Sequence, residues 1–335
     1  MIGSGRFTSS QTAIVTAWLC LAGGCSTVGV APSTQHAARG LSFLQADQLD
    51  EALAEFQMAV ALNPELALAH SQMGGIYKRR GEYELAAVSL ERAVKLDPFN
   101  VQDALNLGEV YRLLNNLKAA IRAYLHACDL DPASYEAVLQ LGVCHCLLGG
   151  YQQAIERFQR AVELEPTSAF AWQNLGAAYD ATGEYYQAIR AYRSSLECDS
   201  HQPMVLVNLG TTYLKQERFI PAERVLELAT KTDPTLAPAH CRLAYCYYRQ
   251  RRYQQALETY GHSLELDETM PDAHAGLGVV CMTMYLLDSS ATEHYEKAVE
   301  SWHRSLELNP DQPVLKRLLA KYRRKTVPPD LLSGN

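Results

Sequence analysis

Gly142 to Gly176 reads GVCHCLLGGYQQAIERFQRAVELEPTSAFAWQNLG, and the same pattern returns along most of the chain. A small residue opens each copy at intervals of 34, at Gly40, Gly74, Gly108, Gly142, Gly176, Gly210, Ala244 and Gly278. In most copies a second small residue follows 12 positions later and a third after seven more, as Ala154 and Ala161 do here. A fixed period of this length indicates one array of repeats and not a series of unrelated domains.

Each copy has the pattern of two helices. Apolar side chains recur every three or four positions within each half, which is helical spacing. Most copies close with a proline such as Pro166, which stops one helix and can start the next. In two copies the proline comes three residues later, as Pro203 and Pro271, at the expected first turn of the following helix. We therefore expect helix pairs throughout residues 33–312.

This order of small and aromatic residues with a closing proline resembles the tetratricopeptide repeat. The resemblance covers residues 33–312 and implies an all-α fold, a right-handed superhelical solenoid of eight helix pairs. It also implies a concave face lined by the first helix of each pair. Because one pair cannot bury its apolar face alone, neighbouring pairs should share a continuous core.

The last copy is longer than the others. Its second small residue, Ala298, follows Gly278 by 20 positions, whereas the first and second small residues of the other copies are 12 positions apart. We expect the eight extra residues, near 286–295, to form a longer helix end and loop. Residues 313–335 should form a capping helix and a tail, since a solenoid needs a cap where it has no further neighbour. The inward face of this helix is predicted to consist of Leu315, Leu318, Leu319 and Tyr322.

Residues 1–32 have a different composition. Arg6 is the only charged side chain before the apolar run Ala13–Ala22, and this layout is typical of a secretory signal peptide. The following segment, LAGGCS, resembles the lipobox of bacterial lipoproteins, although Ala22 holds the place where that family prefers Leu. The resemblance implies lipidation of Cys25 and a membrane-anchored chain in the cell envelope that faces the periplasm.

Two alternatives for the amino terminus stay open. The charge-free stretch Thr12–Ala31 is about long enough to be an uncleaved membrane anchor, and a cleaved signal without lipid is the other option. Each of the three would take the repeats out of the cytoplasm.

The composition and motifs argue against several functions. A net charge of −7 disfavours nucleic acid as a partner, because phosphate binding needs a concentrated basic surface. The chain has no phosphate-binding Gly-rich loop, no HExxH and no GxSxG, so we expect no catalytic residue, no cofactor and no enzyme activity. Cys144-His145-Cys146 has zinc-ligand residue types, but two helix positions turn the side chains about 200° apart. We expect no metal site, and we expect the repeat cysteines to be mostly small buried residues.

The residue two positions before each opening small residue should point into the groove, and we name it the ladder position. The ladder positions of repeats two to seven hold Gln72, Asn106, Gln140, Asn174, Asn208 and Arg242. A primary amide carries a donor and an acceptor and can pair with any peptide backbone. A similar Asn ladder in the repeats of the O-linked N-acetylglucosamine transferase implies binding of extended peptides. The alternative is that Asn is simply the common residue at this position.

Late in the groove the predicted binding residues change to Arg242, Tyr245, Tyr248 and Arg249, and Tyr and Arg dominate binding hot spots. We therefore expect a non-enzymatic scaffold for partner proteins or extended peptides. The resemblance to tetratricopeptide lipoproteins suggests envelope or pilus assembly. A cytoplasmic or helix-anchored adaptor, or a regulatory repeat protein of an enzyme complex, are the alternatives. The sequence leaves the oligomeric state open.

Overall fold

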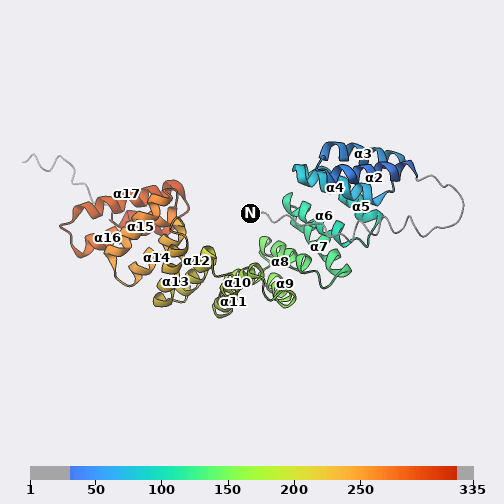
Figure 1. Ribbon diagram of the computed structural model, residues 1–335. Helices are drawn as coiled ribbons and strands as arrows, with labels where there is room; N and C mark the ends of the chain where they lie inside the picture. Colours follow the sequence, from blue (N-terminus) through green and yellow to red (C-terminus); the bar gives the residue numbers. More distant parts are fainter. Residues whose placement is uncertain (1–30, 323–335) are drawn as a thin grey trace, which may run out of the picture. The chain divides into compact units, whose positions relative to one another are not determined.

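The computed structural model describes residues 31–322, and its elements in that range are seventeen α-helices without a strand (Figure 1). The first helices of the pairs are α2 (Pro32–Gln45), α4 (Ala67–Arg80), α6 (Val101–Leu113), α8 (Tyr135–Leu147), α10 (Ala169–Ala181), α12 (Pro203–Lys215), α14 (Ala237–Arg249) and α16 (Pro271–Leu287). The second helices are α3 (Leu49–Leu62), α5 (Tyr83–Leu96), α7 (Leu117–Leu130), α9 (Tyr151–Leu164), α11 (Tyr185–Cys198), α13 (Phe219–Thr232), α15 (Tyr253–Leu266) and α17 (Thr292–Leu308). The predicted eight pairs and the additional helix α18 (Pro313–Tyr322) are confirmed.

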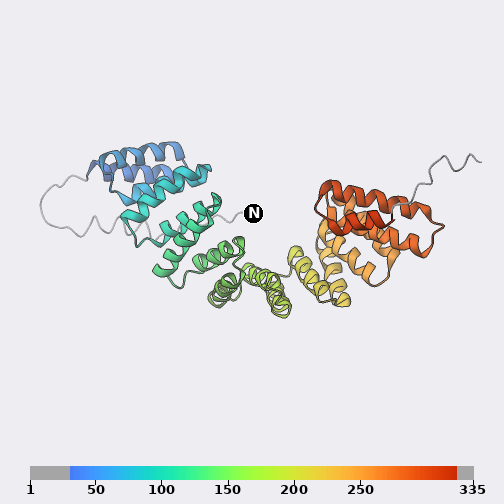
Figure 2. The same cartoon turned by 180° about the vertical axis from the view of Figure 1, so that it is seen from behind.

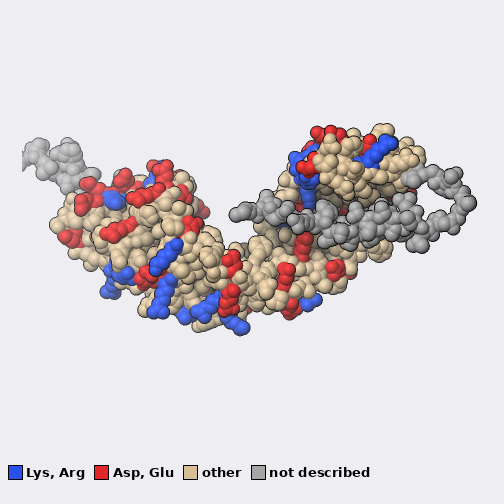
Figure 3. All heavy atoms as spheres, in the orientation of Figure 1, with Lys and Arg blue, Asp and Glu red and all other residues tan. Residues whose placement is uncertain are grey.

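The chain divides into two compact units, residues 1–103 and 104–335, and the boundary falls in the first turn of α6. The first helices α2, α4, α8, α10, α12, α14 and α16 each pack against the second helix of their own pair (Figures 1 and 2). Acidic and basic side chains are interleaved within each unit on the face drawn in Figure 3. Some of them pair across neighbouring repeats, such as Arg79 with Asp47 at 2.6 Å and Arg249 with Glu217 at 3.0 Å.

The 34-residue period of glycine is a packing requirement. A Cβ atom at Gly142 would lie 2.6 Å from the Phe158 ring, and one at Gly176 would lie 2.7 Å from the Tyr192 ring. Carbon atoms pack at about 3.5–4.0 Å, so no side chain fits. The same contact, with the large residue 16 positions later, occurs at Gly40, Gly74, Gly108 and Gly210.

The turn inside the first seven pairs needs one residue with positive φ, just after the first helix. Glycine takes this position in three pairs, at Gly81, Gly149 and Gly183. The other four pairs have Asp47, Asn115, Glu217 and Arg251 there, with φ between 57° and 62°. A side chain is costly in this conformation, so these turns carry strain that glycine would relieve.

The last pair accommodates its extra residues in both helices. The helices α16 and α17 have 17 residues each, whereas α14 has 13 and α15 has 14. The connection at 288–291 is also one residue longer than that at 250–252. The extra residues thus lengthen α16, α17 and the connection between them. In residues 31–322 no helix is both long and apolar enough to cross a membrane.

The capping helix α18 covers the end of the core as predicted. Leu315 is buried, and Leu318, Leu319 and Tyr322 are partly buried against the core of the second unit. The inward face of this helix is therefore the predicted one.

The start of α18 repeats the arrangement at the start of α12, which is a first helix. Gln312 Nε2 donates to the carbonyl oxygens of Ser305 at 3.0 Å and Asn309 at 2.9 Å, just before Pro313. Gln202 Nε2 donates in the same way to Ser195 at 3.0 Å and Asp199 at 2.7 Å, just before Pro203. Thus α18 lies in the register of a further first helix.

Candidate functional site

The six predicted ladder residues all lie on first helices and are all partly exposed. Gln72 belongs to the first unit and the other five to the second. In the second unit the first helices α8, α10, α12, α14 and α16 pack each against the next, so Gln140, Asn174, Asn208 and Arg242 lie on neighbouring helices. Asn174 Nδ2 donates to the Phe170 carbonyl at 2.7 Å, which leaves the side-chain carbonyl of Asn174 as the acceptor for a ligand.

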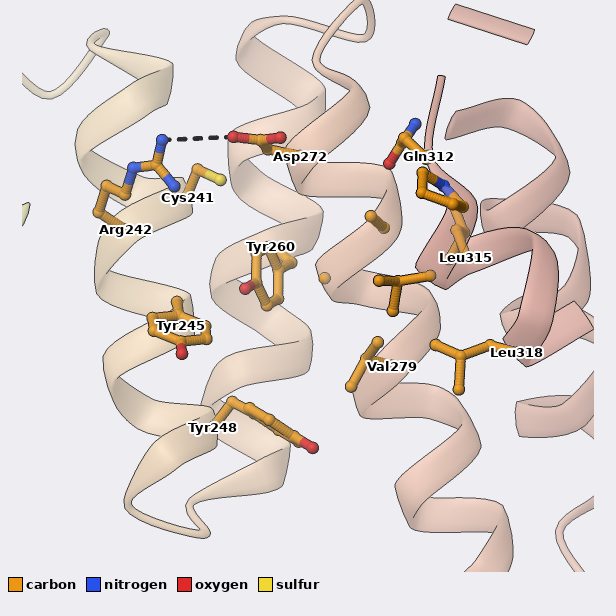
Figure 4. A pocket seen from close by; sticks show the side chains of 14 residues that line it. Cys241, Arg242, Tyr245, Tyr248, Tyr260, Asp272, Val279, Gln312, Leu315 and Leu318 are labelled. Atoms are coloured by element: carbon orange, nitrogen blue, oxygen red, sulfur yellow. Dashed lines mark hydrogen bonds and ion pairs between the residues drawn. The ribbon is translucent and has the colours of Figure 1, made fainter. Parts of the chain in front are cut away.

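A cavity of about 480 Å³ lies in the second unit between α14, α16 and α18, with one residue of α15 at its floor (Figure 4). Its volume is in the range of cavities that bind small ligands. Three of the predicted binding residues line it, namely Arg242, Tyr245 and Tyr248. The structure therefore brings the aromatic and the basic part of the prediction to one cavity.

The walls of the cavity are mostly apolar and its two charged groups lie at one edge. Arg242 pairs there with Asp272 at 3.3 Å, and both side chains are well exposed. The apolar walls include Val279, Leu315 and Leu318. A ligand for this cavity needs an apolar group with a hydrogen-bonding group beside it.

Tyr260 forms the floor of the cavity and was not among the predicted groove residues. Its side chain is 3% exposed, and burial holds the pKa of its hydroxyl well above the ordinary value, so the phenol stays neutral. Within residues 31–322 the hydroxyl makes no hydrogen bond. Figure 4 shows the ring between the side chains of α14 and those of α16 and α18. The protein thus presents an unpaired hydroxyl to the cavity.

Models of the tetratricopeptide repeat match residues 72–135, 134–201 and 237–270. The chain is a tetratricopeptide repeat protein. A sequence search of curated proteins found no match.

Solved structures share this tetratricopeptide fold at low sequence identity. The C-terminal part of a repeat protein from Cytophaga hutchinsonii matches with a TM-score of 0.61 and 19% identity, over 72% of this chain and 98% of that one. The Cut9–Hcn1 structure of the APC/C matches with a TM-score of 0.57 and 17% identity, over 94% of this chain and 60% of that one. PilF of Pseudomonas aeruginosa matches with a TM-score of 0.52 and 21% identity, over 62% and 94%. These identities show a common fold and nothing more.

Arg249 does not line the cavity. Its guanidinium donates to the Tyr245 hydroxyl at 2.8 Å and to Glu217 at 3.0 Å, and these bonds raise its pKa. It also lies over the Phe219 ring, 4.6 Å from the centroid. Since Glu217 and Phe219 belong to the preceding tetratricopeptide repeat, Arg249 joins two repeats and orients Tyr245.

The cysteines have the environment of packing residues. The buried ones are Cys144, Cys241, Cys246 and Cys281, and burial raises the pKa of each of these thiols. The other repeat cysteines are Cys128 and Cys146, partly buried, and Cys198, exposed. No group of His, Cys, Asp and Glu that could hold a metal ion occurs in residues 31–322. The predicted lipidation site Cys25 lies outside the described residues.

Proposed function

We propose that this protein is a non-enzymatic scaffold that binds partner proteins through extended segments laid along the ladder positions. The observation that carries the proposal is the recurrence of partly exposed amides at one position of successive first helices, at Asn106, Gln140, Asn174 and Asn208. A primary amide at each of these positions can donate to a peptide carbonyl and accept from a peptide N–H, whatever the peptide side chains are.

The surroundings of these amides favour backbone recognition. Their partial burial restricts their rotamers, so less conformational entropy is lost when a peptide binds. The Asn174 amide is already held by the Phe170 carbonyl, and its free acceptor suits a peptide N–H. Each hydrogen bond contributes about 1 kcal/mol, so affinity should come from several ladder positions acting together.

The test is a comparison of single and combined substitutions. Asn174→Ala alone should weaken binding of a partner captured from an envelope extract by less than about tenfold. The triple substitution with Asn106→Ala and Asn208→Ala should nearly abolish it, while the helix content stays the same. Gln152→Ala is the matched control, because it removes an exposed amide from the second helix α9. Unchanged affinity of the folded triple variant would rule out the ladder.

We further propose that the protein is exported, tethered by a lipid on Cys25 and employed in assembly of an envelope structure such as a pilus. The support is the segment LAGGCS behind an apolar run; the likeness to PilF adds a shared fold. The intact mass of the natural protein should show an acylated chain that begins at Cys25, and Cys25→Ser should release the protein from membranes or leave it unprocessed. A full-length chain without acyl mass would favour a cytoplasmic or helix-anchored adaptor.

A further inference from the structure

The cavity lies at the carboxyl-terminal end of the row of ladder positions, and the last three of these positions line it. Arg242 and Gly276 are the ladder residues of α14 and α16, two positions before Ala244 and Gly278. Leu318 is the corresponding residue of α18, because it follows Gln312 by six positions as Asn208 follows Gln202. After the amides, the ladder position therefore holds Arg on α14, Gly, which has no side chain, on α16, and Leu on α18.

Two departures from the repeat pattern place the Tyr260 hydroxyl in the cavity. In the other pairs the corresponding large residue packs on a glycine of its own pair, but here Ala244 has a Cβ in that place. The ring of Tyr260 instead lies against Gly276 of the next first helix, where a Cβ would be 2.3 Å from Cζ and 2.4 Å from the hydroxyl oxygen. The missing side chain at the ladder position of α16 is thus replaced by a phenol from α15.

The edge of the cavity has the groups that an extended peptide needs. Arg242 supplies donors and Asp272 an acceptor, 3.3 Å apart and open to solvent. One residue of an extended chain presents its N–H and C=O on the same edge, and can therefore bond to both. Its neighbour points its side chain to the opposite face, as in other modes of strand recognition.

We propose that this cavity is a specificity subsite for an extended partner segment, and that it takes one large apolar side chain of the segment. The side chain packs between Tyr245 of α14 and the walls formed by Val279 and Leu318. A backbone carbonyl of the segment accepts the hydrogen bond of the Tyr260 hydroxyl. This inference rests on the proposed function, because it assumes that extended segments bind along the ladder.

The hydroxyl makes the subsite testable without disturbing the fold. The Tyr260 hydroxyl is not among the fully buried polar atoms of residues 31–322 that lack a partner, because it is open to the cavity, and a ligand that fills the cavity must replace the water there with an acceptor of its own. Since no hydrogen bond within the fold is lost, Tyr260→Phe should leave the stability nearly unchanged, and should still weaken peptide binding roughly three- to tenfold. If Tyr260 had only a structural role, the substitution would not weaken peptide binding while leaving the stability of the fold unchanged.

The probe is a phage-displayed library of random nine-residue peptides, selected on the full chain. Selected peptides should share one large apolar residue, and Tyr260→Phe should weaken them as stated. Ala275→Trp, which places a large side chain in the lining, should reduce their binding more than tenfold. Tyr192→Phe is the matched control, since Tyr192 is equally buried at the same repeat position but packs on Gly176. It should leave binding unchanged.

Three outcomes would overturn the subsite. If neither Tyr260→Phe nor Ala275→Trp changes peptide affinity while the triple ladder variant loses it, the proposed function stands and the subsite falls. If the ladder variant is also unaffected, or if the wild-type chain selects no peptide, both fall. If replacing Leu331 and Leu332 by Ser in the full chain raises peptide affinity more than tenfold, the chain's own tail and not a partner is the occupant.

Discussion

Replacing Asp103 by Ala should stabilise the first unit at neutral pH. The Asp103 side chain is 1% exposed, and Ser71 Oγ donates to its Oδ1. Its Oδ2 has no hydrogen-bond partner in the described chain. The corresponding positions of other repeats hold fully buried small residues, namely Ala69, Ala137, Ala171, Val205, Ala239 and Ala273. Asp103 therefore places a carboxylate where the repeat pattern has an apolar side chain.

The expected gain is the difference between opposing effects. Removing a buried and partly unpaired carboxylate gains about 1–3 kcal/mol. Losing the hydrogen bond with Ser71 costs about 1 kcal/mol, and losing an acidic residue from the first turn of α6 costs about 0.5 kcal/mol. The net gain at neutral pH is therefore about 0.5 kcal/mol for Asp103→Ala, the midpoint of these opposing contributions.

The gain should depend on pH in a definite direction. Burial is the main cause that raises the pKa of Asp103 above its ordinary value of 3.8, and the nearby Asp97 adds to the effect. Between 3.8 and the raised pKa the folded state binds the proton more tightly than the unfolded state, so wild-type stability falls as the pH rises through this window. The advantage of Asp103→Ala should be complete above the window and should disappear below pH 3.8.

Urea titrations at several pH values, with hydrogen exchange of the α4 and α5 amides, would measure this difference. Ser71→Ala is the control: it should destabilise the wild type and have little effect in the Asp103→Ala background. A variant that is less stable than wild type at neutral pH would show that the carboxylate is compensated in the fold, and would refute the argument.

Other substitutions test the packing and the turns. Arg251→Gly should raise the free energy of unfolding by up to about 1 kcal/mol, because φ is 62° there, and Gly183→Arg at the equivalent turn should lower it. Gly142→Ala should destabilise by about 1–3 kcal/mol, because its Cβ would overlap Phe158. Gly261→Ala in α15 has open space around it and should stabilise by about 0.5–1 kcal/mol, as urea titrations would show. Iodoacetamide should modify the exposed Cys198 before the buried cysteines, and mass spectrometry of the folded protein would follow the rate at each residue. Equal rates of modification would contradict the difference in burial.

The repeat period was enough to predict the helix pairs. Pro203 and Pro271 begin α12 and α16 as expected, because proline fixes the backbone of a first helical turn in any context. The inward face of α18 was predicted with its four residues, since helical spacing alone determines which side chains share a face.

The cavity could not be predicted in the same way. The exchange of Gly for Ala at 244 and the glycine at 276 are visible in the sequence, but the direction in which Tyr260 then leans depends on packing across two helices. Arg249 shows the same limit: its position on α14 indicated a groove residue, whereas Glu217 and Phe219 determine where its guanidinium lies. Such partners come from different repeats and differ from one repeat to the next.

The register of α18 allows the length of the array and the identity of its end to change independently. A tandem duplication of an internal helix pair would add one ladder position for every 34 residues and leave α14 to α18 intact. The protein would then read a longer partner segment with the same final cavity. An insertion after Asn309 would do the reverse, because it would part α18 from α16 and dismantle the cavity while the number of amides stayed the same. Descendants or designed versions of this chain could therefore vary reach and selectivity as separate properties.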